Sequence, residues 1–179
     1  MSGSLGKLIE SARGKLEGQA LLDKFPLMAE RHPYCGDADD LSMLLRKLPF
    51  PYSSLTSSAC FDEDYPIPPK EAFRDDMRDL PVDEGEWAVL QRLCARKGIS
   101  TFGQLHDCYL ATDVLALCDV LVNFRTSFKA VLKLDPLGFL TLPKCAWYGA
   151  LYRSKAKIQL VTADQEPVSY THLTLPTKA

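Results

Sequence analysis

The segment from Thr101 to Lys133 constrains the fold more than any other part of this sequence. It contains no proline, its only glycine is Gly103 near the start, and apolar residues are dense throughout. Proline breaks a helix and glycine weakens one, so this segment can form a single continuous helix. Because apolar residues occur around its whole circumference, we predict one long helix that is largely buried.

Helical patterns with recognisable ends occupy much of the remaining chain. Ser4 precedes apolar residues at helical spacing and is expected to cap a short amphipathic helix. A second helix is expected over Asp37–Lys47, and a third over Asp83–Lys97, which has acids early, bases late and Gly98 just past its end. Pro143 is expected to open a further short helix. The fold class expected is therefore mainly α.

Between these helices, the residues from Pro49 to Pro69 read PFPYSSLTSSACFDEDYPIPP. Repeated prolines and serines are incompatible with a regular helix, so this segment is expected to be an extended loop on the surface. Pro69 is expected to begin a short helix through KEAF. Asp135-Pro136 marks a turn, and the segment Lys157–Val161 is a candidate strand.

Composition limits the classes of protein that fit. The chain has 179 residues, of which 46% are hydrophobic and 25% charged, which suits one domain with one core. The net charge of -2 argues against a free-standing nucleic-acid binder, so any contact with DNA must be local. Six cysteines without a CxxC pair, and no long apolar run near the start, lead us to expect a reduced, intracellular protein that is not secreted and not in a membrane. The compartment stays open.

The C-terminal residues from Val168 to Thr177 read VSYTHLTLPT, which resembles the translation of an untrimmed sequencing adapter. We therefore expect residues 166–179 to be a non-native tail and the natural frame to have been cut near Gln165. Met1 is expected to be an internal methionine of a longer protein. The alternative for the tail is an ordinary strand rich in β-branched residues.

Within the predicted long helix, Tyr109 and Asp113 are four residues apart, so their side chains share one face. A carboxylate can hold a divalent cation such as Mg²⁺, and a phenol can orient an attacking water, so the pair suits metal-assisted hydrolysis of a phosphodiester. Alone, YxxxD is a weak signal, and without further context a buried tyrosine beside a solvated aspartate is the favoured interpretation.

The surrounding sequence is more specific. TFGQLHDCYLATDVLALCDVLVNFR, from Thr101 to Arg125, resembles the region of the third exonuclease motif in protein-primed family B DNA polymerases of viruses, linear plasmids and mobile elements. Upstream, three blocks look like segments of the same family in the same order: SGSLGKL from Ser2, LLRKLPFPYSSLTS from Leu44 and PPKEAF from Pro68. Downstream, LDPLGFLTLPKCAWYGAL looks like another, with Lys144 where a glycine is usual. The resemblance extends from Ser2 to about Gln165.

The resemblance implies a fold, an activity and three site residues. Residues 1–165 would be the helical C-terminal part of a ribonuclease-H-like α/β 3′-5′ exonuclease domain that leads toward the polymerase palm. Asp113 would be a ligand of a two-metal Mg²⁺ site, Tyr109 the phenol that positions water, and Lys47 a residue that binds the scissile phosphate. The partners would be template and primer DNA, deoxynucleotides and a terminal priming protein. Lys47 can also be read as a solvated lysine, and the family tends to have glycine where Leu48 stands.

Other motifs of the family do not occur in this sequence. Neither the DxE motif nor the Asn…Asp motif of the exonuclease is found, and the nucleotide-adding motifs YxGG, DxxSLYP and DTD are also not found. Asp62-Glu63-Asp64 matches DxE only loosely and is interpreted as a solvated acidic turn. We therefore expect the 179-residue chain alone to have no nuclease or polymerase activity. Two alternatives are a helical interaction module without catalytic ancestry and a decayed copy of a mobile element.

Overall fold

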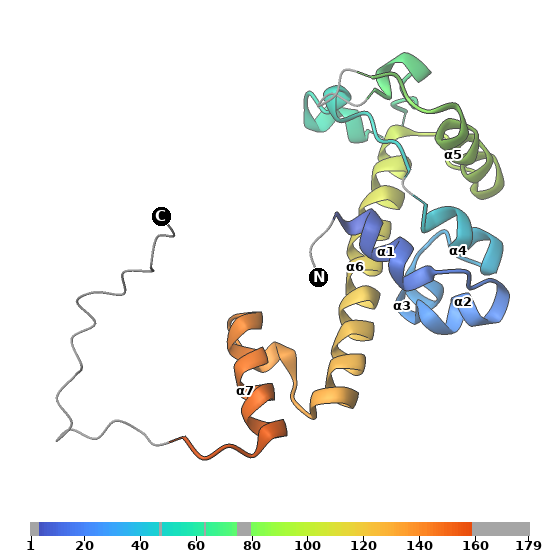
Figure 1. Cartoon of the computed structure of the whole chain (residues 1–179). Coiled ribbons are helices and arrows are strands. Elements are labelled where there is room, and N and C mark those ends of the chain that lie inside the picture. Colours follow the sequence, from blue (N-terminus) through green and yellow to red (C-terminus); the bar gives the residue numbers. More distant parts are fainter. Residues whose placement is uncertain (1–3, 47, 63, 75–79, 159–179) are drawn as a thin grey trace, which may run out of the picture.

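The computed structural model describes residues 4–46, 48–62, 64–74 and 80–158, and this part of the chain is mainly helical (Figure 1). The α-helices are α1 (Leu5–Arg13), α2 (Gly18–Lys24), α3 (Pro26–Arg31), α4 (Ala38–Leu44), α5 (Glu84–Lys97), α6 (Phe102–Leu132) and α7 (Leu142–Ser154). Short 3-10 helices are η1 (Tyr52–Ser54), η2 (Ser58–Phe61), η3 (Lys70–Ala72) and η4 (Pro136–Gly138). The described residues contain no strand, only an isolated bridge between Pro66 and Thr101. The mainly α fold class is confirmed.

Helix α6 is the element on which the others are arranged. It has 31 residues, a length of about 46 Å at the usual rise per residue. Thr101 and Gln104 form a capping box at its start, and Lys133 ends it in the left-handed conformation. Figure 1 shows α1 to α4 gathered beside the N-terminal half of α6, with α7 beside its C-terminal end. The long helix predicted from the sequence is thus confirmed to within a residue at each end.

The core lies between the N-terminal half of α6 and the helices α1 to α5. Its fully buried side chains come from many segments of the chain: Phe25, Met28, Leu41, Leu44, Leu93 and Phe102. Burying each such side chain contributes about 1.5–3 kcal/mol relative to leaving it exposed. This contribution stabilises helices that are too short to be stable alone.

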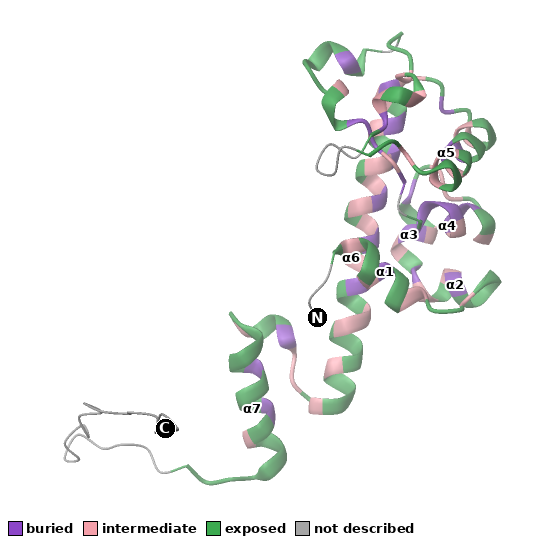
Figure 2. Ribbon diagram, turned by 45° about the horizontal axis from the view of Figure 1, so that its top comes forward, coloured by how far each residue is buried: buried purple, intermediate pink, exposed green. Residues whose placement is uncertain are grey.

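The prediction that α6 is largely buried is wrong for much of its length. Leu117 is 51% exposed and Val131 is 68% exposed, and Figure 2 shows exposed positions along the C-terminal half of α6 and over most of α7. The error arose because dense apolar residues indicate burial only if other elements surround the helix. Despite this exposed apolar surface, the described part of the chain contains no helix with the length and hydropathy of a membrane span.

Sequence patterns did not predict α2 and α3, which form a corner held by polar side chains of α6. The two carboxylate oxygens of Asp119 accept hydrogen bonds from the N–H groups of Leu27, at 3.1 Å, and Met28, at 2.9 Å, in the first turn of α3. One turn later, Asn123 donates to the carbonyl oxygen of Lys24 at the end of α2, at 2.9 Å. Helix α6 therefore supplies the caps that the corner lacks in its own sequence.

A buried carboxylate joins α4 to α5. The Asp40 side chain is fully buried, and Lys97 and the N–H of Gly36 donate to it, while Nε of Arg96 lies 2.7 Å from its second oxygen. Burial opposes ionisation of Asp40, but the bonds from Lys97 and Gly36 and the charges of Lys97 and Arg96 outweigh it and hold the carboxyl pKa below its ordinary value. Asp37 caps α4 by accepting from the N–H of Asp40 at 2.8 Å.

Several predicted boundaries shift. Ser4 occupies the N-cap position of α1, but its side chain makes no capping hydrogen bond. Helix α4 ends at Leu44, and Pro69 precedes a single 3-10 turn instead of opening an α-helix. Of the candidate strand, Lys157 and Ile158 lie in no strand, and its other residues are outside the described part of the chain. Residues 166–179, the predicted tail, are also outside it.

The corner between α2 and α3 yields a test of the capping by α6. Asp119→Ala would leave the N–H groups of Leu27 and Met28 without acceptors and should lower the free energy of unfolding by about 2–3 kcal/mol. Asp107→Ala, which removes an exposed carboxylate from the same helix, should change it by less than about 0.5 kcal/mol. Urea denaturation followed by circular dichroism measures both. Equal effects of the two substitutions would contradict a capping role for Asp119.

His32 is a buried neutral imidazole between α3 and α6. Its Nδ1 accepts from the N–H of Tyr34 at 3.2 Å, so the ring hydrogen is on Nε2, which lies 3.0 Å from Oγ1 of Thr112 and 3.3 Å from the carbonyl oxygen of Cys108. Burial lowers the pKa of His32, and the bond to Cys108 opposes this only in part. A second ring proton would point at the N–H of Tyr34.

This environment predicts a loss of stability at mildly acidic pH. The unfolded chain binds a proton at His32 below about pH 6.5, whereas the folded chain resists it, so the free energy of unfolding should fall as pH drops below 6.5. At pH 5.5 the loss from this residue is at most about 1.4 kcal/mol. Urea titrations at pH 7.5 and 5.5 should show a larger loss for the native chain than for His32→Gln. Identical losses would rule out the neutral imidazole as the cause.

Candidate functional site

Tyr109 and Asp113 project from α6 into the same cavity, as the four-residue spacing predicts. The cavity has a volume of about 220 Å³ and is bounded by α1, the end of α4 and the middle of α6. Ile9 and Leu45 provide apolar walls, and the Arg46 side chain also lines it. Both site residues are partly exposed, so neither is sealed beneath apolar packing.

The phenol of Tyr109 has two polar neighbours. Its oxygen lies 2.8 Å from the hydroxyl oxygen of Tyr52, and it also interacts with the carboxylate of Asp113. Burial, the bond with Tyr52 and the negative charge of Asp113 raise the pKa of Tyr109 far above its ordinary value. The phenol is therefore neutral at any physiological pH, and it can orient a ligand by hydrogen bonding but cannot act as an anionic base.

Asp113 is a half-buried carboxylate without a cationic partner among the described residues. Burial raises its pKa, and the hydrogen bond from Tyr109 opposes that rise. Its environment differs from that of Asp40, whose charge is balanced by Arg96 and Lys97. A carboxylate that is partly desolvated, faces a cavity and forms no ion pair with the described residues is a candidate for a functional role.

The described residues do not by themselves fit a two-metal centre. They contain no cluster of three or more His, Cys, Asp or Glu side chains that could hold a metal ion. Among the described residues, Asp113 is the one carboxylate that lines this cavity. Two divalent ions need several oxygen ligands, so a complete centre would need carboxylates from outside this group of residues.

An aromatic cluster from the Pro49–Pro69 loop covers the N-terminal side of the site. The ring of Phe50 lies 4.8 Å from that of Tyr109 and 5.2 Å from that of Tyr52, measured between centroids. The loop is held to α6 where the N–H of Phe102 donates to the carbonyl oxygen of Tyr65, at 2.9 Å. A side chain at Gly103 would meet the carbonyl oxygen of Phe61 at 3.1 Å, which explains the glycine near the start of α6.

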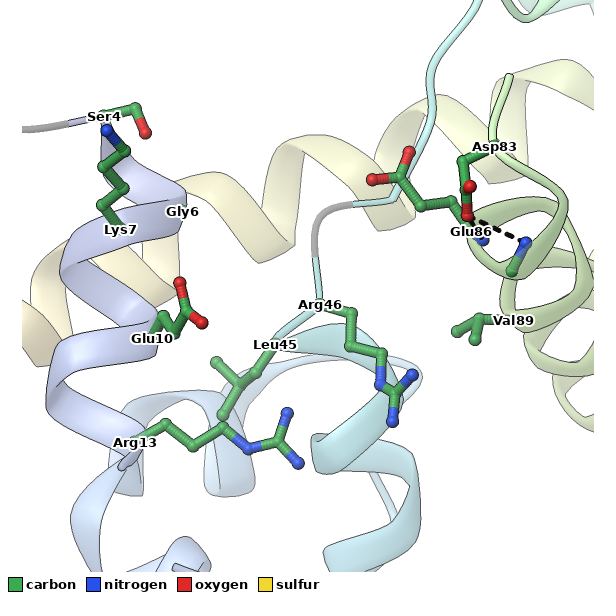
Figure 3. Close-up of a pocket in the computed structure, with 11 residues that line it drawn as sticks. Ser4, Gly6, Lys7, Glu10, Arg13, Leu45, Arg46, Asp83, Glu86 and Val89 are labelled. Atoms are coloured by element: carbon green, nitrogen blue, oxygen red, sulfur yellow. Dashed lines mark hydrogen bonds between the residues drawn. The ribbon is translucent and has the colours of Figure 1, made fainter. Parts of the chain in front are cut away.

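A larger cavity of about 610 Å³ adjoins the first, between α1, the end of α4 and the start of α5 (Figure 3). Its charged lining is mixed, with Lys7, Arg13 and Arg46 beside Glu10, Asp83 and Glu86. Asp83 is occupied in capping α5, as Figure 3 shows, and Arg13 donates to Oγ of Ser42 at 2.8 Å. Arg46 lines both cavities, whereas the family resemblance assigns phosphate binding to its neighbour Lys47.

The remaining sequence-based assignments have different outcomes. Lys47, proposed to bind phosphate, lies outside the described residues, so its prediction stays untested. Leu48, where the family tends to have glycine, is a buried core residue. His106, one turn before Tyr109, packs on Phe61 with 4.6 Å between ring centroids and does not line the cavity. Asp62 and Asp64 are exposed, which agrees with a solvated acidic turn for these two residues.

The desolvated carboxylate predicts an effect on stability. Asp113→Asn removes a charge that burial disfavours but keeps an oxygen that can accept from Tyr109, so it should raise the free energy of unfolding at pH 7.5. The increase should be less than about 1 kcal/mol, because the carboxylate is only half-buried. Urea denaturation measures the change, with Asp107→Asn as the exposed control on α6. Destabilisation of the chain by Asp113→Asn would instead identify a structural carboxylate.

Comparison of the chain with protein-family models, with curated proteins and with solved structures finds no match. Any function for this chain therefore rests on the sequence blocks and on the geometry around Tyr109 and Asp113.

Proposed function

We propose that this chain is part of a DNA-directed DNA polymerase of the protein-primed family B type, and that it belongs to the 3′-5′ proofreading exonuclease. The ordered sequence blocks from Ser2 to about Gln165 support the family. The observation that carries the exonuclease role is the convergence of Tyr109 and Asp113 on one cavity, with the carboxylate half-buried and without an ion-pair partner among the described residues. The helical chain would then be the C-terminal portion of a ribonuclease-H-like domain.

In this proposal the two side chains have separate tasks. Asp113 would supply one oxygen ligand of a Mg²⁺ site, whose metal would provide the activation of water needed to hydrolyse the terminal phosphodiester of DNA. Tyr109, as a neutral phenol, would position the attacking water beside that carboxylate by hydrogen bonding. The other carboxylates would come from the DxE and Asn…Asp motifs of the parent protein. Its partners would be template and primer DNA, deoxynucleotides and a terminal priming protein.

A second function, a helical interaction module, is favoured by the exposed apolar residues of α6 and α7. Trp147 is 58% exposed and Leu117 is 51% exposed. Large apolar surfaces of this kind mark sites of contact with other protein. This alternative accounts for the surface but not for the ordered blocks. A decayed mobile-element copy would keep the blocks and would have lost the other catalytic motifs, so the genomic sequence on both sides of this chain separates the three possibilities.

The test uses the complete reading frame recovered from adapter-trimmed sequence and expressed as a whole enzyme. Asp113→Ala should reduce 3′-5′ digestion of single-stranded DNA by more than about 100-fold, a larger loss than that from removing a partner of a metal ligand. Nucleotide insertion on a primed template should change by less than about threefold, because it uses a separate site. Digestion and insertion are measured with the same labelled primer.

Asp107→Ala is the matched control, because Asp107 is an exposed acid on the same helix and does not line the cavity. It should leave both activities unchanged. An equal loss of digestion and insertion in the Asp113 variant would refute the assignment. Digestion by the purified 179-residue chain alone would also contradict it, since the described residues supply this cavity with one carboxylate, which does not complete the proposed centre.

A further inference from the structure

Tyr52 reaches the candidate site from the loop that precedes it. It lies in η1, within the Pro49–Pro69 segment, and its hydroxyl oxygen is 2.8 Å from that of Tyr109. The two rings are perpendicular, with centroids 6.1 Å apart. The contact joins residues 57 positions apart in the sequence, so nothing in a local motif indicated it.

The hydrogens at this contact can be assigned by counting. Each phenol has one hydrogen to donate, and an ionised carboxylate can only accept. If Tyr109 donates to Asp113, the short contact with Tyr52 requires Tyr52 to donate to the oxygen of Tyr109. The result is a chain of hydrogen bonds in one direction, from Tyr52 to Tyr109 to Asp113. Such chains polarise each bond in turn and fix the orientation of the middle group.

The packing around Tyr52 favours this role over a role in the core. The residue is 58% exposed, so burial of its ring contributes little, and its hydroxyl is nevertheless directed at Tyr109. Phe50 supports both rings, with centroid distances of 5.2 Å to Tyr52 and 4.8 Å to Tyr109. Phe50 itself is buried and stacks on Phe102 in the first turn of α6. The loop thus holds the Tyr52 hydroxyl beside the site through a rigid aromatic support.

We infer that Tyr52 is a positioning residue for the exonuclease, and that it acts by donating to Tyr109 and so directing the Tyr109 hydrogen toward Asp113. The inference rests on the proposed function for the reaction it would serve, but the hydrogen-bond chain itself is a property of this chain alone. Loss of the Tyr52 hydroxyl frees the Tyr109 hydroxyl to rotate, which lowers the rate of the chemical step without removing a contact to DNA.

The hydrogen-bond chain is tested first on the 179-residue protein. Tyr52→Phe, Tyr109→Phe and the double variant are unfolded with urea, with Tyr65→Phe as a control in the same loop, since the Tyr65 hydroxyl has no partner among the described residues. Each single variant should lower the urea midpoint. The double variant should lower it by less than the sum of the two single shifts, because both substitutions remove the same hydrogen bond. Strictly additive shifts would overturn the inference.

The positioning role is tested in the complete enzyme. Tyr52→Phe should lower kcat for single-stranded DNA digestion by about 10-fold, as removal of the partner of a site residue typically does, with KM and nucleotide insertion unchanged. When Tyr109 is already replaced by Phe, Tyr52→Phe should cause no further loss of kcat, because its effect passes through the Tyr109 hydroxyl. A rise in KM alone, or a Tyr65→Phe variant equally impaired, would refute the role.

The two measurements also separate this inference from the proposed function. An intact parent enzyme without any 3′-5′ digestion would overturn both the exonuclease assignment and the positioning role. Active digestion that is sensitive to Asp113→Ala but unaffected by Tyr52→Phe would keep the exonuclease and reject Tyr52 as a positioning residue.

Discussion

The capping of the α2–α3 corner by α6 is the interaction on which the rest of the structure depends. Helices α2 and α3 have only 7 and 6 residues, too few to be stable in water without outside support. Asp119 and Asn123 satisfy backbone groups of this corner, and Phe25 and Met28 bury their side chains beside α6. Once the corner is fixed, α1 and α4 are placed as well, and they form the walls of the cavity that holds Tyr109 and Asp113.

Two aspartates of α6 show how surroundings assign roles to the same side chain. Asp119 is buried, and two backbone N–H groups donate to it, so its polar capacity is used within the fold. Asp113, less than two turns earlier, faces a cavity with only Tyr109 as a hydrogen-bonding neighbour in the described part of the chain. A carboxylate left in this condition costs stability, and proteins keep such groups where they serve binding or chemistry.

The Pro49–Pro69 loop is anchored to α6, although its composition predicted only an extended surface loop. Prolines and serines prevent a regular helix, yet the segment is anchored through Phe50, whose ring stacks on Phe102 at a centroid distance of 5.6 Å. The loop therefore delivers a second phenol, Tyr52, to the first. Together with α6 it makes a compact aromatic and carboxylate centre out of segments that are remote in the sequence.

The sequence by itself determined the features that depend on neighbours within one or two turns. It predicted the spans of α6 and α5, Gly98 just past the end of α5, the helix break from Pro49 to Pro69, and the shared face of Tyr109 and Asp113, because helical periodicity and helix-end signals are local. Only the tertiary structure decided that α2 and α3 form, because the Asp119 cap of α3 is 92 residues away from Leu27. It also decided that the C-terminal half of α6 is exposed and that Tyr52 pairs with Tyr109. These features depend on which segments meet in space, and no local pattern of residues encodes that choice.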